Sequence, residues 1–230
     1  MITQLDKKSE DSGLLIPETE VADLTYAEAP RGLYCFVKPV LDILLSIFVL
    51  TAAIVPMAMI ALAIWMDDPG KVFFSQKRVG RGGKQFNMYK FRTMKMDAPK
   101  YIATMELEHP EHYVTRVGAF LRKTSLDELP QLLNILKGDM SLIGPRPLIP
   151  NEAEIHRMRT RFGVYNIRPG ITGLAQINGR DTVLPADKVR YDVEYVKGFG
   201  VSMDLRIMLT TIPKILSKEG VATGNGTKKE

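Results

Sequence analysis

The stretch VLDILLSIFVLTAAIVPMAMIALAIWM, residues 40–66, decides the fold of this chain, because it is apolar for 27 residues with one charged side chain, Asp42. As a helix rising about 1.5 Å per residue it would be roughly 40 Å long, whereas the hydrocarbon core of a membrane is about 30 Å thick. The stretch is too long, and begins too late, to be a cleaved signal peptide. The sequence therefore predicts a helix that enters a membrane.

Pro56 lies inside this helix, where proline removes one backbone hydrogen bond and crowds the preceding turn, at a cost of about 3 kcal/mol or a bend. Both flanks are basic, and basic residues stay on the cytoplasmic side of a membrane. They are Arg31 and Lys38 before the stretch, and Lys71, Lys77, Arg78, Arg81 and Lys84 after it. A bent helix that returns to the side it entered from fits both features, and a kinked single span is the alternative.

Charge is unevenly distributed along the 230 residues, whose net charge is +5. Residues 1–30 hold seven acidic side chains against two lysines, a net charge of −5, so the remainder carries +10. An acidic segment without hydrophobic periodicity is typical of disorder, and we expect residues 1–32 to form a disordered tail. The basic remainder indicates anionic partners such as phosphates, nucleotides or lipid headgroups. The single cysteine, Cys35, excludes an internal disulfide.

Two segments rich in aromatic and β-branched residues follow, KVFFSQKRVG (71–80) and KQFNMYKFRTM (84–94), joined by GRGGK (80–84). Because glycine tolerates positive φ, this pattern predicts a β-hairpin. Lys90 and Arg92 are two residues apart and would share one face of the second strand, either as solvated charges or as a phosphate clamp. No Gly-Lys-Ser/Thr follows the glycines, which excludes a P-loop.

Two adjacent carboxylates, Asp127 and Glu128, lie in LRKTSLDELPQLLNILKGDMSLIGPRP, residues 121–147. Ser125 followed by Glu128 fits a capping box at the start of a helix, and Gly138 is placed to end that helix. A helix start also favours ionised carboxylates and bound phosphate, and adjacent acids can bind Mg²⁺ or attack phosphorus. Spacing alone leaves a helix cap and a reaction centre equally open.

Arginines on proline- and glycine-rich backbone come next. Arg146 lies between two prolines in SLIGPRPLIP, and Arg168 and Arg180 lie in IRPGITGLAQINGR. Such loops approach ligands closely and suit bidentate phosphate recognition, although ordinary turns with solvated arginines are the alternative. Near the C-terminus, MDLRIMLTTIPKILSK, residues 203–218, has one apolar helical face, which predicts a core helix or an interfacial membrane helix.

The segments KFRTMKMDA, LRKTSLDELPQLLNILKGDMSLIGPRPL and RPGITGLAQINGR occur in this order after a membrane stretch with a central proline. In this the chain resembles, from about residue 33 to residue 216, the bacterial sugar transferases, which are monotopic polyprenyl-phosphate sugar-1-phosphate transferases. The motifs are long and specific to this family. The chain would be its short, minimal form.

The resemblance implies an α+β, mostly helical fold with a small β-hairpin and amphipathic interfacial helices. It implies a re-entrant membrane helix at 33–67, broken at Val55-Pro56, a cytosolic catalytic domain at 68–218 and a flexible tail at 219–230. The protein would lie in the bacterial inner (cytoplasmic) membrane with its catalytic domain facing the cytosol, and a homodimer is compatible with this arrangement.

The resemblance also implies a reaction, in which sugar-1-phosphate passes from a UDP-sugar to undecaprenyl phosphate and UMP is released. The route would be ping-pong, with a covalent aspartyl-phosphosugar intermediate, as the first membrane step of capsule, O-antigen, exopolysaccharide or glycoprotein glycan synthesis. The nucleophile and its partner carboxylate match Asp127 and Glu128, with Mg²⁺ held at this pair. Other polar positions of the family's site match Lys90, Arg122, Arg146, Arg180 and Asp204.

A protein of another class, a non-catalytic basic module anchored to the membrane, would also explain the net charge and the apolar stretch. It gives no reason for Asp127 and Glu128 to accompany Lys90 and Arg146. A nucleic-acid binder is not expected, because the sequence contains no recognisable binding module and does contain a membrane stretch.

Overall fold

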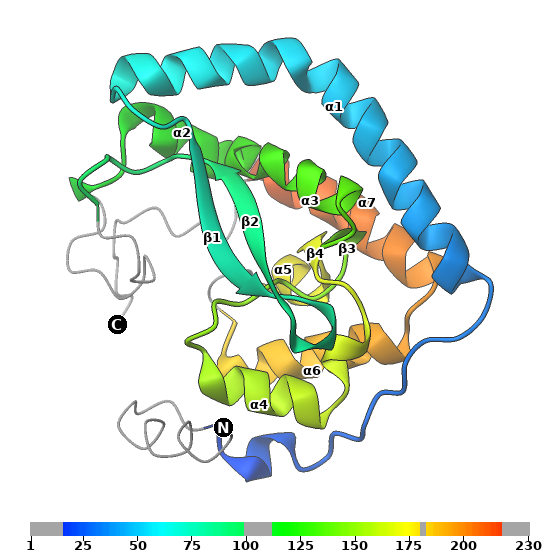
Figure 1. The fold of residues 1–230 in the computed structure, drawn as a ribbon. Helices are drawn as coiled ribbons and strands as arrows, with labels where there is room; N and C mark the ends of the chain where they lie inside the picture. Colours follow the sequence, from blue (N-terminus) through cyan, green and yellow to red (C-terminus); the bar gives the residue numbers. More distant parts are fainter. Residues whose placement is uncertain (1–15, 99–111, 180–182, 218–230) are drawn as a thin grey trace.

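A computed structural model of the chain describes residues 16–98, 112–179 and 183–217 (Figure 1). A long helix, α1 (Tyr34–Asp67), arches along one side, and the other elements gather beneath it. These elements are β1 (Phe73–Val79), β2 (Gln85–Phe91), α2 (Arg116–Thr124), α3 (Leu132–Leu136), β3 (Ser141–Ile143), α4 (Ala153–Arg161), β4 (Gly170–Thr172), α5 (Leu174–Ile177), α6 (Pro185–Lys197) and α7 (Val201–Ser217). Short 3₁₀ helices are η1 (Glu18–Val21), η2 (Arg81–Gly83), η5 (Leu126–Gln131) and η6 (Val164–Asn166).

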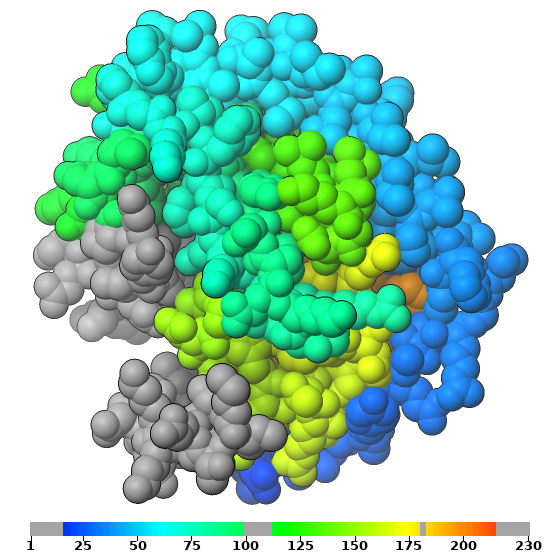
Figure 2. Space-filling view, viewed as in Figure 1, coloured from blue at the N-terminus to red at the C-terminus, as the bar shows by residue number. Residues whose placement is uncertain are grey.

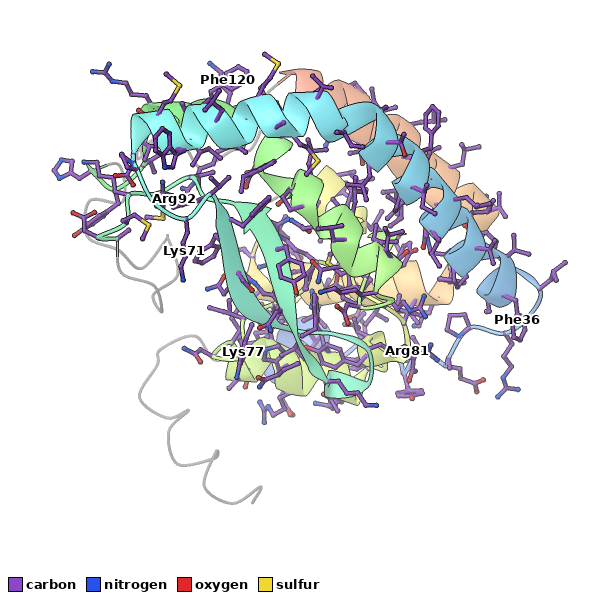
Figure 3. All side chains as sticks on the ribbon, turned by 45° about the horizontal axis from the view of Figure 1, so that its top comes forward. Phe36, Lys71, Lys77, Arg81, Arg92 and Phe120 are labelled. Atoms are coloured by element: carbon purple, nitrogen blue, oxygen red, sulfur yellow. The ribbon has the colours of Figure 1, made fainter. Side chains whose placement is uncertain are left out.

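The two faces of α1 differ sharply. The inner face buries Lys38, Asp42, Ser46 and Ile64 against the rest of the protein. The outer face exposes large apolar side chains, and Figure 3 shows Phe36 pointing away from the body of the protein. Just 6% of the most apolar 18-residue window is buried, so α1 is not the core helix of a soluble domain. It is long and apolar enough to cross a membrane.

The predicted break at Val55-Pro56 is corrected by the structure, because helical geometry continues through both residues. The helix bends near its middle instead (Figure 1). Pro56 has no N–H to donate to the carbonyl of Ala52, one turn earlier, and the loss of this one bond can be accommodated by curvature. Thr51 Oγ1 bonds the carbonyl of Ile47 at 2.9 Å, which adds a local contact on the N-terminal side of the bend.

The predicted hairpin is confirmed. β1 and β2 pair antiparallel with Phe74 opposite Lys90, and Gly82 and Gly83 adopt φ values of 67° and 72° in the connecting turn. The hairpin lies across the middle of the face seen in Figure 2, with α1 along the upper and right-hand margin. Met88 packs with the buried apolar residues of α3, so one face of the hairpin is fixed against the segment that follows Asp127 and Glu128.

The main hydrophobic core lies beneath the hairpin. It joins α4, α5, α6 and α7 with β3. β3 pairs with β4 in a second, parallel two-stranded sheet. Gly170 makes this sheet possible, because a Cβ there would lie 2.1 Å from the backbone nitrogen of Gly144. The close approach fixes the loop that begins at Gly144 and carries Arg146.

Residues 16–32 belong to the folded protein, which corrects that part of the prediction of a disordered tail at 1–32. Ile16, Val21 and Ala27 are buried in the main core, and η1 packs against α6. Arg190 of α6 binds Asp23 with Nη1–Oδ2 at 2.6 Å. Ile16, Val21 and Ala27 are enough to hold this acidic segment in the core. The average composition of residues 1–30 does not reveal such a small number of well-spaced apolar side chains. Residues 1–15 lie outside the described part of the chain.

We expect Val21→Asp to lower the free energy of unfolding by roughly 2–4 kcal/mol, because it places a charge where Val21 is 2% exposed. The control is Thr19→Asp, which adds the same charge at an exposed position of the same 3₁₀ helix. Denaturant unfolding in detergent measures both variants. Equal stabilities for the two would show that residues 16–31 do not belong to the folded core.

Candidate active site

Asp127 and Glu128 lie on η5, directly after a strained turn. α2 ends at Thr124, and Ser125 has φ 57°, the one positive value among described residues other than glycine. A left-handed conformation costs a residue with a Cβ about 1–2 kcal/mol, and such strain is concentrated at functional sites. The turn places Asp127 in the interior, where it is 8% exposed.

The predicted capping box is wrong. The side chain of Ser125 does not cap the helix that follows, and the carboxylate of Glu128 turns to two cations. Charge-assisted bonds to cations are stronger than a bond to a backbone N–H, so tertiary contacts override the local cap. The segment forms the 3₁₀ helix η5 and then the short α3 rather than one α-helix. The predicted stop at Gly138 agrees with its φ of 80°.

Three segments bring opposite charges together here. Lys90 of β2 donates from Nζ to Glu128 Oε1 at 2.8 Å and lies 3.7 Å from Asp127 Oδ2. Arg146, from the loop after β3, donates from Nη2 to the same Oε1 at 3.2 Å. The side chains of Lys90, Asp127 and Glu128 are 17%, 11% and 14% exposed, so water screens these charges weakly. The structure thus assembles four of the predicted site residues.

The environment moves the pKa values of the two acids apart. Burial raises the pKa of Asp127, and the charge of Glu128 adds to this effect, while Lys90 opposes it. Burial also acts to raise the pKa of Glu128, but Lys90 and Arg146 outweigh it and hold that pKa well below its usual range. Glu128 therefore stays ionised, and Asp127 takes up a proton first as the pH falls.

Arg122, also predicted for the site, lies near this cluster. Its Nε donates to Thr93 Oγ1 at 2.9 Å, and its charge acts to lower the pKa of Asp127. Arg180 lies outside the described residues.

Arg92 does not share the role of Lys90. β2 ends at Phe91, so the alternation of strand faces does not extend to Arg92. Arg92 pairs instead with Asp68 at the end of α1, with Nη1–Oδ2 at 2.9 Å, and its side chain is 8% exposed. The two predicted alternatives, a solvated basic face and a joint phosphate clamp, are therefore both wrong for this pair of residues.

The backbone around Arg146 is held by two arginines that sequence reasoning missed. Arg159 Nη1 donates to the carbonyl of Arg146 at 2.8 Å, and its Nη2 and Nε bond Asp192 Oδ2 at 2.6 and 2.9 Å. The side chains of Arg159 and Asp192 are each 1% exposed, so a buried ion pair anchors the loop that carries Arg146 to the core. Arg78 Nη1 donates to the carbonyl of Pro147 at 3.4 Å.

Arg78 places a second guanidinium group near Arg146. Burial and the nearby positive charge of Arg146 lower the pKa of Arg78 to about 10. Adjacent guanidinium groups repel each other, and an anion bound between them would relieve this repulsion. Its place on the hairpin face that also carries Lys90 was a usable sequence signal. The Arg159–Asp192 pair, 33 residues apart, had no local signal.

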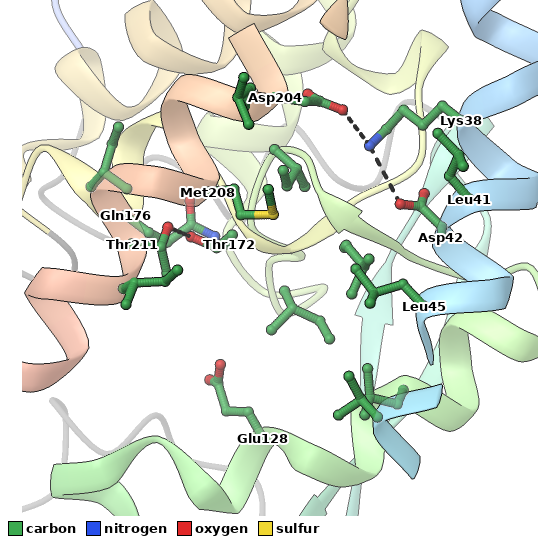
Figure 4. Close-up of a pocket in the computed structure, with 18 of the residues that line it drawn as sticks. Lys38, Leu41, Asp42, Leu45, Glu128, Thr172, Gln176, Asp204, Met208 and Thr211 are labelled. Atoms are coloured by element: carbon green, nitrogen blue, oxygen red, sulfur yellow. Dashed lines mark hydrogen bonds and ion pairs between the residues drawn. The ribbon is translucent and has the colours of Figure 1, made fainter. Parts of the chain in front are cut away.

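Asp204 lies in a second polar cluster, at the end of a cavity opposite Glu128 (Figure 4). Asp204 Oδ2 accepts from Lys38 Nζ at 2.6 Å, and Oδ1 accepts from the Tyr195 hydroxyl at 2.7 Å. Lys38 also pairs with Asp42, with Nζ–Oδ1 at 3.6 Å. The structure therefore does not group Asp204 with the carboxylates, and its contacts fasten the start of α1 to α6 and α7.

The cavity between these clusters has a volume of about 730 Å³. The N-terminal half of α1 and α7 form opposite walls, and β3 and β4 lie between them (Figure 4). Most of its lining is apolar, whereas Glu128 and Arg146 give one end a charged rim. The predicted C-terminal helix is thus confirmed, with Asp204 and Ile207 buried and Leu205, Leu209 and Ile212 exposed.

The oxygen donors of the carboxylate pair are chemically compatible with a Mg²⁺ ion. Among the described residues, no three His, Cys, Asp or Glu side chains form a metal-binding cluster. Mg²⁺ is, however, commonly bound by one or two carboxylates together with substrate phosphates and water. Lys90 and Arg146 both bond Oε1 of Glu128, which leaves its Oε2 and the Asp127 carboxylate for an ion.

Comparison with known proteins identifies the family to which the chain belongs. The sequence model of the family described as bacterial sugar transferase matches residues 33–218. The exopolysaccharide production protein ExoY of Sinorhizobium fredii is 36% identical over 193 residues, covering 78% of this chain and 85% of that protein.

Two further relatives carry more specific names. The UDP-glucose:undecaprenyl-phosphate glucose-1-phosphate transferase of Caulobacter vibrioides is 39% identical over 200 residues, 83% of this chain and 73% of that protein. The UDP-N-acetylgalactosamine-undecaprenyl-phosphate N-acetylgalactosaminephosphotransferase of Aeromonas hydrophila is 37% identical over 199 residues, 83% of this chain and 46% of that protein. The family match covers every described residue of the carboxylate cluster, and the chain belongs to the bacterial sugar transferase family.

Proposed function

We propose that this protein transfers sugar-1-phosphate from a UDP-sugar to undecaprenyl phosphate by a two-step route through a covalent intermediate on Asp127. Family membership and the names of the relatives support the overall reaction. The observation that carries the route is the pair of adjacent carboxylates, of which Asp127 is buried and Glu128, partly buried, is kept ionised by Lys90 and Arg146.

In the first step, a carboxylate oxygen of Asp127 attacks the phosphorus that carries the sugar. The bond from this phosphorus to the bridging oxygen of the diphosphate breaks, and its electron pair leaves with UMP. An acyl phosphate now joins Asp127 to the phosphosugar. Arg146, which bonds Glu128, and Arg78, which bonds the carbonyl of Pro147, would neutralise the charge of the diphosphate, which an anionic nucleophile could not otherwise approach.

In the second step, a phosphate oxygen of undecaprenyl phosphate attacks the same phosphorus. The bond to Asp127 breaks, the carboxylate is regenerated, and the product is a sugar diphosphate lipid. One nucleophile thereby serves a donor from water and an acceptor from the membrane in turn. Lys90 holds Glu128 beside Asp127 throughout, with Nζ–Oε1 at 2.8 Å.

Asp127 and Glu128 would hold Mg²⁺ together with the phosphates of the substrate, and the bound ion would neutralise phosphate charge as a Lewis acid. A non-catalytic basic module needs none of these contacts. Such a module would have no reason to bury Asp127 beside Glu128 or to fix the Arg146 loop with a buried ion pair.

We further propose that α1 is re-entrant and that the protein lies on the cytosolic face of the bacterial inner membrane. Residues 16–31 pack in the main core, and the other end of α1 leads to β1 of the same folded unit. A helix fastened at both ends to one unit cannot place those ends on opposite sides of a membrane. The bend and the exposed apolar outer face are consistent with insertion into one leaflet.

Asp127→Asn should abolish UMP release, by at least a thousandfold, because an amide cannot act as the attacking carboxylate. Release of UMP from a panel of UDP-sugars, with undecaprenyl phosphate and Mg²⁺, measures the effect. Asp187→Asn, the same change at an exposed position on α6, should retain full activity. Turnover by Asp127→Asn at the rate of the unmodified protein would exclude the proposed nucleophile.

The pH profile of kcat/KM should have an acidic limb above pH 4, the ordinary range of an aspartate, because the pKa of Asp127 is raised and attack requires its deprotonated form. Activity therefore rises with pH through that pKa. In Glu128→Gln the limb should move to lower pH, whatever the residual rate, because a negative neighbour is removed and Lys90 remains. A limb that stays in place or moves upward would contradict the coupling between the two acids.

Re-entry predicts that both ends of α1 are accessible from the cytosol alone. Arg31→Cys and Lys71→Cys, each made in a Cys35→Ser background, place single thiols at exposed positions before and after the helix. A membrane-impermeant maleimide should label both in inside-out vesicles and neither in intact spheroplasts. Labelling of the position 31 thiol from outside would show a single span.

A further inference from the structure

The cavity between α1 and α7 contains one polar side chain with no assigned role. Gln176, on α5, is 9% exposed, and among the described residues neither its Nε2 nor its Oε1 has a hydrogen-bond partner. A buried amide without partners costs free energy, and in native proteins it generally points to a ligand or water that supplies them. The other polar groups of this wall are paired, since the Thr172 and Thr211 hydroxyls bond each other at 2.9 Å (Figure 4).

The lining of the cavity suits a largely apolar ligand with one polar end. Leu41 and Leu45 of α1 lie across the cavity from Met208 of α7 (Figure 4), and Leu205 of α7 also lines it. Glu128 and Arg146 lie at one end, and the mutually paired Lys38, Asp42 and Asp204 close the other. Its volume of about 730 Å³ lies within the range of small-molecule sites, roughly 300–1,000 Å³.

Several apolar residues that line the cavity are also exposed on the surface of α1 and α7. Leu205, on the cavity wall, is 47% exposed, and its neighbours on α7, Val201 and Leu209, are 61% and 60% exposed. Leu44 lines the cavity from α1 and is 59% exposed. An acyl or prenyl chain can therefore pass between α1 and α7 without leaving an apolar environment.

We propose that this cavity is the binding site of the acceptor lipid, a single-chain prenyl phosphate, and that the Gln176 amide forms a hydrogen bond with the phosphate end of this lipid. The prenyl chain runs between α1 and α7, and the phosphate faces the rim formed by Glu128 and Arg146. Gln176 thereby distinguishes a lipid phosphate from a purely apolar chain. This assignment rests on the proposed function for the identity of the acceptor, but binding to the cavity does not require turnover.

A polyprenyl phosphate that carries a diazirine on its prenyl chain, away from the phosphate end, tests the site directly. The full-length protein is reconstituted in phosphatidylcholine vesicles, irradiated, digested and analysed by mass spectrometry. Adducts should fall on peptides containing Leu41–Leu45 and Leu205–Met208. Excess undecaprenyl phosphate should remove them, whereas phosphatidylglycerol and undecaprenol, which lack the single chain or the phosphate, should not. Adducts confined to the outer face of α1, around Phe48 and Ile54, would overturn the proposal, as would equal competition by phosphatidylglycerol.

Matched variants on one helix isolate the cavity. Leu205→Trp fills it, and we expect at least a fivefold loss of competable labelling together with a higher KM for undecaprenyl phosphate. Leu209→Trp adds the same bulk at an exposed position of α7 that does not line the cavity, and should change neither quantity. An equal loss of competable labelling in both variants would contradict a lipid-binding site inside the cavity.

Gln176→Leu keeps the size of the side chain and removes the amide. We expect the concentration of undecaprenyl phosphate that halves labelling to rise about tenfold, with less than a twofold change in the KM for the UDP-sugar and an unchanged unfolding temperature. An unchanged competition curve would remove Gln176 from the site. Labelling does not require sugar transfer. If the protein is labelled as expected but does not transfer sugar-1-phosphate, the proposed function is wrong and the proposed lipid-binding site is retained.

Discussion

Two adjacent carboxylates can be buried together only where cations compensate them, and this constraint organises the centre of the structure. Lys90 and Arg146 both reach one oxygen of Glu128, so the hairpin and the loop after β3 must meet η5 at that atom. The Arg159–Asp192 pair extends the constraint into the core by fixing the carbonyl of Arg146. The charges that keep Glu128 ionised leave Asp127 beside it as the acid with the raised pKa.

The long helix depends on the same assembly. Its C-terminal half packs on Phe91 and Leu121, beside the carboxylate cluster, and its N-terminal half is fastened to α7 through Lys38 and Asp204. Between these two attachments α1 and α7 enclose an apolar cavity with Glu128 at its rim (Figure 4). The helix is therefore a wall of the site as well as an apolar surface, and its two ends belong to one folded unit.

Local sequence signals predicted the local structure well. Two segments rich in aromatic and β-branched residues, joined by a glycine turn, were sufficient to predict the hairpin. The family motifs predicted one site for Lys90, Asp127, Glu128 and Arg146, and these four side chains lie together in the structure. The failures share a physical cause, which is tertiary contact. Glu128 bonds two cations that are distant in sequence instead of capping the helix. A few buried side chains hold residues 16–31 in the core despite the acidic composition of this segment. Pairs remote in sequence, such as Arg159 with Asp192, produce no periodic pattern from which they could be predicted.

Mass spectrometry of the first step tests whether Asp127 forms a bond to phosphorus. The protein is incubated with Mg²⁺ and a UDP-sugar that supports UMP release, without any lipid acceptor, and is then digested under acidic conditions that preserve acyl phosphates. We expect one added phosphosugar on the peptide that contains Asp127, and we expect it to disappear when undecaprenyl phosphate is supplied. UMP formation without this adduct, or an adduct on another residue, would contradict a covalent intermediate on Asp127.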